Sequence, residues 1–215
     1  MTLYFIPGLG ADHRVFSRLV LPPHCKPVYL DWIKPVPGET LHDYSLRFGE
    51  AIDATRPFGL IGLSMGGMVA TEIAQVKPPV HTVLLSSATS VRQLTGFERA
   101  LGSLHLEKAL PGRLLKQPNP LLYHVLSAED EATRTLVKNM QHDTDPDHFK
   151  WSLRAILDWK NETLPPRLVR IHGSADRLIP ARNVPADHLI EGAGHLAVFT
   201  HAAQVSGILA ALFPG

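Results

Sequence analysis

The feature that most constrains the fold of this chain is an alternation between short apolar runs and segments with helical spacing. Six runs have the composition of buried strands: Thr2–Ile6, Pro27–Leu30, Phe58–Leu63, Val80–Ser86, Leu168–His172 and His188–Ile190. Between several of them, apolar residues recur at helical spacing, as at Leu41, Tyr44, Phe48 and Ile52. Because such alternation implies right-handed crossovers, it predicts an α/β fold with a mostly parallel sheet covered by helices on both faces.

The alternation breaks between about residues 89 and 166, where no strand-like run occurs. Proline-containing breaks divide this stretch into helical segments: Pro111–Gly112, Pro118–Asn119–Pro120 and Asp145–Pro146. The clearest helix begins at Thr144–Asp145–Pro146, where a capping residue precedes a proline at the first helical position. We therefore predict a single domain over residues 1–215, with an all-helical cap inserted at about residues 89–166.

Composition and charge exclude several classes of protein. The 215 residues include 21 Lys+Arg and 20 Asp+Glu, so the chain has no basic excess for binding nucleic acid. No apolar stretch approaches the ~18 residues that a membrane-spanning helix needs. No targeting segment precedes the turn at Pro7–Gly8, which favours a cytoplasmic location. The single cysteine, Cys25, cannot form an intrachain disulfide.

One acidic cluster has the alternation of a calcium-binding loop. Asp143, Asp145 and Asp147 are spaced as its first carboxylates would be. The glycine and the terminal glutamate that such a loop needs are His148 and Arg154 here. We therefore expect no metal at this cluster.

The segment Gly62–Leu63–Ser64–Met65–Gly66–Gly67 places a G-x-S-x-G motif between a predicted strand and a predicted helix. A serine on so sharp a turn has a strained backbone, and its hydroxyl projects above the sheet. Glycines at 62 and 66 avoid collisions with the crossing backbone. The following helix directs its amino-terminal amides toward the place where negative charge would develop. This context predicts Ser64 as a nucleophile; the alternative is a glycine-rich turn without a catalytic role.

A serine nucleophile needs a base and a group that orients the base, both at the same edge of the sheet. His195 follows the predicted strand that ends at Ile190, and Asp176 follows the one that ends at His172. The chain order Ser, Asp, His is the order expected for this type of hydrolase. We predict His195 as the base and Asp176 as its partner, with Asp31 as the alternative acid. For His172, which directly precedes Gly173, we expect a structural role.

An oxyanion requires two backbone amides, one from the residue after the nucleophile and one from the loop after the first strand. Met65 supplies the first amide. The segment Pro7–Gly8–Leu9–Gly10 can turn the chain so that the amide of Leu9 points toward Ser64. The alternative for this segment is an ordinary tight turn.

Together, these loop segments resemble the α/β-hydrolase fold superfamily over nearly the whole chain. The layout with a single insertion is similar to small capped carboxylesterases related to pimeloyl-carrier-protein methyl esterase, in which a helical lid separates the halves of the sheet. Two departures stand out. Pro7 occupies the usual position of a histidine, and the chain starts at what would be the third strand, which omits the antiparallel hairpin of larger members. The resemblance then implies a sheet of about six strands.

The resemblance implies an acyl transfer without metal or cofactor, on a small-molecule ester with a small to medium acyl chain. Candidate substrate contacts from the cap are Phe149, Tyr123, Trp151 and Trp159, although aromatic residues on helices more often belong to the core. A C–C lyase or a ligand-binding receptor with little turnover is the alternative, since a fold does not fix a reaction. Epoxide hydrolases and dehalogenases of this fold carry aspartate in place of Ser64. The sequence predicts no oligomeric state.

Overall fold

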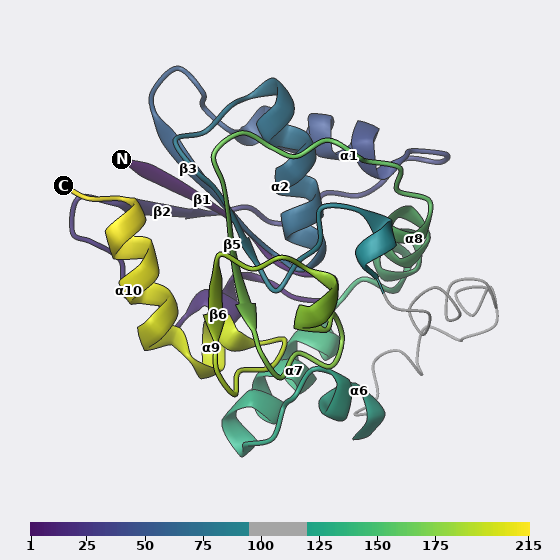
Figure 1. Ribbon diagram of the computed structural model, residues 1–215. Helices are drawn as coiled ribbons and strands as arrows, with labels where there is room; N and C mark the ends of the chain where they lie inside the picture. The colour runs from purple at the N-terminus through teal and green to yellow at the C-terminus, as the bar shows by residue number, and fades with distance from the viewer. Residues whose placement is uncertain (95–119) are drawn as a thin grey trace.

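The computed structural model describes residues 1–94 and 120–215, and its centre is a parallel sheet (Figure 1). The strand order is β2-β1-β3-β4-β5-β6, and every pairing between these strands is parallel. The strands are β1 (Thr2–Ile6), β2 (Lys26–Tyr29), β3 (Phe58–Leu63), β4 (Thr82–Leu85), β5 (Leu168–Gly173) and β6 (His188–Ile190). The predicted α/β fold with about six strands is confirmed.

Helices cover both faces of this sheet, as Figure 1 shows. The α-helices are α1 (Leu41–Phe48), α2 (Met65–Val76), α6 (Pro120–Val125), α7 (Glu131–Asp143), α8 (Pro146–Leu157), α9 (Ala197–Thr200) and α10 (Ala202–Leu212). Short 3₁₀ helices are η1 (His13–Phe16), η2 (Gly49–Ala51), η3 (Val91–Gln93) and η4 (Ala181–Asn183). Among the described residues, no helix combines the length and apolar character needed to cross a membrane.

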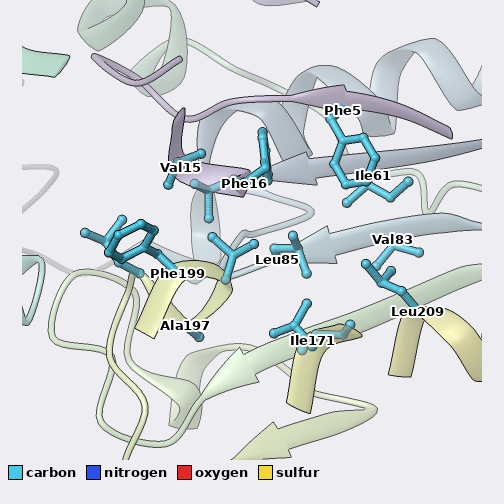
Figure 2. Packing of buried hydrophobic residues seen from close by; sticks show 14 of the residues in the cluster. Phe5, Val15, Phe16, Ile61, Val83, Leu85, Ile171, Ala197, Phe199 and Leu209 are labelled. Carbon is cyan, nitrogen blue, oxygen red and sulfur yellow. The ribbon is translucent and has the colours of Figure 1, made fainter. Parts of the chain in front are cut away.

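Two apolar clusters form the core, one on each face of the sheet. Because side chains alternate along a strand, Phe5 packs on one face while its neighbours Tyr4 and Ile6 pack on the other. Figure 2 shows the first cluster, in which Phe5, Ile61 and Val83 face Leu209 of α10. The second cluster packs the opposite face against α1 and α2. Each large apolar side chain buried in this way contributes about 1.5–3 kcal/mol to folding.

Some element boundaries differ from those predicted. The periodicity from Leu41 to Ile52 predicts one helix, but α1 ends at Phe48 and continues as the 3₁₀ helix η2. The closing helix is divided into α9 and α10, because the backbone of His201, with φ −121° and ψ 36°, leaves the helical region. Apolar periodicity does not detect such a break, since residues of both helices pack into the same apolar cluster.

The described part of the predicted cap contains η3, α6, α7 and α8, and no strand occurs in it. Asp145 caps α8 by accepting a hydrogen bond from Asp147 N, with Pro146 at the first helical position. Helix α7 packs against η1, and α8 packs against α1, so the cap lies across the loops that follow β1 and β2. The single-domain organisation and the cap boundaries stay predictions, because residues 95–119, with the break at Pro111–Gly112, lie outside the described residues.

Candidate active site

Ser64 lies on a strained turn between β3 and α2. Its φ of 52° and ψ of −121° are unfavourable for a residue with a side chain. A Cβ at residue 62 would collide with the backbone of Gly66, and one at residue 66 with the carbonyl oxygen of Ile6. Two hydrogen bonds hold the turn, from Ser64 N to Leu85 O (2.9 Å) and from Ser87 Oγ to Ser64 O (2.6 Å).

Asp176 and His195 lie on the loops after β5 and β6 and form a buried pair. The distance from His195 Nδ1 to Asp176 Oδ2 is 2.9 Å, and the two residues are 3% and 4% exposed, respectively. The other carboxylate oxygen, Oδ1, accepts hydrogen bonds from the N–H groups of Leu178 and Ile179, both at 2.9 Å. The carboxylate is therefore fixed by its own loop and presents Oδ2 to the imidazole.

A second imidazole also lies beside this carboxylate. His172 Nε2 is 2.7 Å from Ile179 O and 3.3 Å from Asp176 Oδ2. Since both oxygens are acceptors, Nε2 carries the proton. Burial alone would raise the pKa of Asp176, but the neighbouring His195 imidazole and hydrogen bonds from His172, His195 and Ile179 N–H hold that pKa well below its ordinary value of 3.8. Asp176 is thus an ionised carboxylate at neutral pH.

The sheet topology brings Ser64, Asp176 and His195 to one edge. They follow β3, β5 and β6, and the carboxyl ends of parallel strands meet at the same edge. The Ser64 hydroxyl is half-buried and makes no hydrogen bond to another residue in the described ranges. Asp31, the alternative acid, is exposed on the loop after the edge strand β2.

The residues that carry the two predicted oxyanion amides lie on segments adjacent to Ser64. Met65 is the first residue of α2, where backbone N–H groups have no partner within the helix. Leu9 follows Gly8, and a Cβ at residue 8 would lie 3.3 Å from Ser64 Cβ, so this loop packs against the nucleophile turn. Within the part of the chain that the structure describes, neither the Leu9 nor the Met65 N–H donates a hydrogen bond.

A cavity of about 360 Å³ adjoins the loop that carries Leu9. Its wall includes Gly10 and Ala11 of that loop, Trp32 from the loop after β2, and Met140 and His148 from the cap. The cavity thus lies between the loops that follow β1 and β2 and the helices α7 and α8.

Comparison with known proteins decides the family. A family model described as the alpha/beta hydrolase family matches residues 3–208. This chain belongs to the alpha/beta hydrolase family. No curated protein matches it in sequence.

Solved structures of the alpha/beta hydrolase fold superpose on most of the chain. An esterase from Exiguobacterium antarcticum has a TM-score of 0.77 at 15% identity, covering 98% of this chain and 91% of that one. A thermophilic esterase from Thermogutta terrifontis has a TM-score of 0.74 at 15% identity, covering 97% and 88%. A lipase-esterase related protein from Clostridium acetobutylicum has a TM-score of 0.70 at 18% identity, covering 99% and 94%. At these identities the likeness establishes the fold.

The four aromatic cap candidates lie in different environments in this alpha/beta hydrolase. The Phe149 ring packs against Gly10, beside the loop that carries Leu9. Tyr123 lines a second cavity, together with Arg134 and Arg177. Trp151 packs on Tyr44, with ring centroids 4.4 Å apart, and Trp159 is only 3% exposed and donates its indole N–H to Glu72 Oε1 at 2.6 Å. Of the four, Phe149 is therefore the one placed beside the candidate oxyanion loop.

Two residues that sequence reasoning did not single out contact the site loops. Trp32 donates its indole N–H to Gly8 O, and Ser127 of the cap packs against Gly194 and donates to Ala175 O at 3.5 Å. No motif or periodicity surrounds either residue. These contacts join segments that are distant in sequence, so only the folded chain reveals them.

Proposed function

We propose that this protein is a serine hydrolase that cleaves carboxylic esters with small to medium acyl chains through an acyl-enzyme intermediate. The observation that carries the proposal is the buried hydrogen bond between His195 and Asp176, at the same sheet edge as the strained Ser64. Strained turns and buried carboxylates cost free energy, so their joint occurrence at one edge favours a catalytic role.

The hydrogen bonding assigns each group its chemistry. Because the Asp176 carboxylate can only accept, His195 Nδ1 carries a proton and Nε2 is left as the base. Nε2 takes the Ser64 proton as the hydroxyl attacks the ester carbonyl, and Asp176 stabilises the resulting imidazolium. The amides of Leu9 and Met65 hold the oxyanion. His195 then returns the proton to the leaving alcohol, and water releases the acyl group by the reverse roles.

The cavity of about 360 Å³ has the size of a small-molecule site, and Gly10 and Ala11 of the Leu9 loop line it, whereas Ser64 and His195 do not. The preference for short and medium acyl chains therefore rests on the resemblance to small capped carboxylesterases. No step requires a metal or an organic cofactor.

The test is hydrolysis of p-nitrophenyl acetate, butyrate and octanoate, with intact-mass detection of a serine-reactive phosphonate adduct. We expect Ser64→Ala to lower turnover by about 10⁴-fold or more, because it removes the nucleophile. Ser45→Ala, which changes a buried serine of α1, is the control that retains turnover. An adduct on Ser64 without turnover would instead favour a lyase or a ligand-binding receptor, and the absence of both would refute the proposal.

A further inference from the structure

The loop after β2 places Trp32 against the loop that carries Leu9. Trp32 Nε1 donates a hydrogen bond to Gly8 O at 3.2 Å, and Ala11 N donates to the same oxygen at 3.0 Å. Two donors from different loops therefore converge on the carbonyl of the peptide that joins Gly8 to Leu9.

This arrangement fixes the direction of the Leu9 amide. In a trans peptide the carbonyl and the N–H point in opposite directions, and the described chain contains no cis peptide. With Gly8 O directed toward Trp32 and Ala11, the N–H of Leu9 points in the opposite direction within the same peptide plane. Gly8 itself packs against Ser64, as described above.

We propose that Trp32 is a positioning residue for the oxyanion hole. It acts through the Gly8–Leu9 peptide and does not touch the reacting atoms. This inference rests on the proposed function, in which Leu9 N–H stabilises the oxyanion.

The indole is itself held by a cluster of aromatic rings. Its ring centroid lies 5.4 Å from that of Phe48 on α1, 6.2 Å from that of Tyr44 on the same helix, and 5.3 Å from that of His148 on α8. Rings from both α1 and α8 thus pack around the indole. Without the indole N–H, Gly8 O would keep only the bond from Ala11, and the peptide plane could rotate.

Trp32→Phe tests the proposal, because it keeps an aromatic ring in the cluster and removes the donor. Stabilisation of the oxyanion is felt in the transition state, so kcat should fall by a larger factor than any change in KM. We expect kcat to fall roughly five- to tenfold, the size expected for losing one neutral hydrogen bond. The rate of Ser64 modification by the phosphonate should fall by a similar factor, because its phosphoryl oxygen would occupy the same hole.

Phe48→Leu is the matched control. Phe48 packs on the same indole but makes no hydrogen bond to the Gly8 loop, so this variant should lose stability and keep its kcat. A wild-type kcat in Trp32→Phe would overturn the proposal, and so would an equal kcat loss in Phe48→Leu, since packing would then set the rate. Absence of Ser64-dependent turnover and of an adduct in the wild-type protein would overturn the proposed function, and the role of Trp32 with it.

Discussion

His195 Nδ1 lies 2.9 Å from Asp176 Oδ2, while the backbone of Leu178 and Ile179 occupies the other oxygen of that carboxylate. The two oxygens of Asp176 therefore have different tasks. Oδ1 anchors the side chain to its loop, and Oδ2 orients the imidazole. Because the two oxygens have different partners, the effect of Asp176→Asn on the hydrogen bonding of His195 can be predicted.

We expect Asp176→Asn to lower kcat/KM by about 10³–10⁴-fold. The amide oxygen will stay on the N–H groups of Leu178 and Ile179, so the amide NH₂ will face His195. That group donates and forces Nδ1 to accept, which places the imidazole proton on Nε2 and removes the base. Ester hydrolysis measures the loss, and an unchanged circular dichroism spectrum shows that the fold is kept. A loss of less than tenfold would contradict this tautomer argument.

His172 should support the same carboxylate from the opposite side. His172→Leu removes the Nε2–H that lies near Asp176 Oδ2 and leaves Ile179 O without that donor. We expect kcat to fall roughly tenfold, the size expected for a hydrogen bond to a charged group. His172→Gln, whose amide can donate at a similar reach, should recover most of the rate. Equal losses in both variants would show that His172 acts only in packing.

The cap contacts the loop that carries His195, through Ser127 and Gly194. A Cβ at residue 194 would collide with the side chain of Ser127, whose own φ is 55°. Gly194→Ala should therefore lower the free energy of unfolding by about 1–3 kcal/mol and reduce hydrolysis. Ser127→Gly removes both the obstructing side chain and the backbone strain, so the double variant should recover most of the loss. Urea unfolding of the single and double variants measures this coupling, and strictly additive losses would contradict it.

The cap contact at His148 should make stability sensitive to mild acid. His148 is 6% exposed, and its neighbours that titrate or carry charge are Tyr44, whose hydroxyl is 3.3 Å from Nε2, and Asp145. Burial lowers the pKa of His148 below its ordinary value of 6.5, although the charge of Asp145 partly opposes this. As pH falls through about 6.5, His148 takes up a proton in the unfolded chain before it does so in the folded chain. The free energy of unfolding therefore decreases until the pH reaches the lower pKa of the folded state.

His148→Gln keeps a polar side chain at this position and removes the titration. Between about pH 7.5 and 5.5, the wild-type protein should lose more unfolding free energy than the variant. Urea unfolding at several pH values compares the two proteins, and the remaining histidines contribute equally to both. Parallel pH dependences would show that His148 does not titrate differently in the folded state.

Local sequence determined much of the fold. The strands β1, β3 and β6 have the predicted bounds, because short apolar runs between turn-forming residues leave little choice of structure. The turn at Ser64 was also predictable, since the glycines at 62 and 66 are required by contacts within a few residues or with the adjacent strand. Asp176 and His195 could be singled out because each follows a strand, and parallel strands end at one edge.

Tertiary structure decided the contacts that join distant segments. The hydrogen bond from Trp32 to Gly8 exists because β2 pairs with β1, which brings the loops after these strands together. The contact between Ser127 and Gly194 depends on how the cap packs. The position of the His172 imidazole beside Asp176 depends on the path of the chain from β5 to Ile179. Sequence patterns report local backbone preference and the burial of a face. Which side chain meets which across the fold is set by packing, and packing is a property of the whole chain.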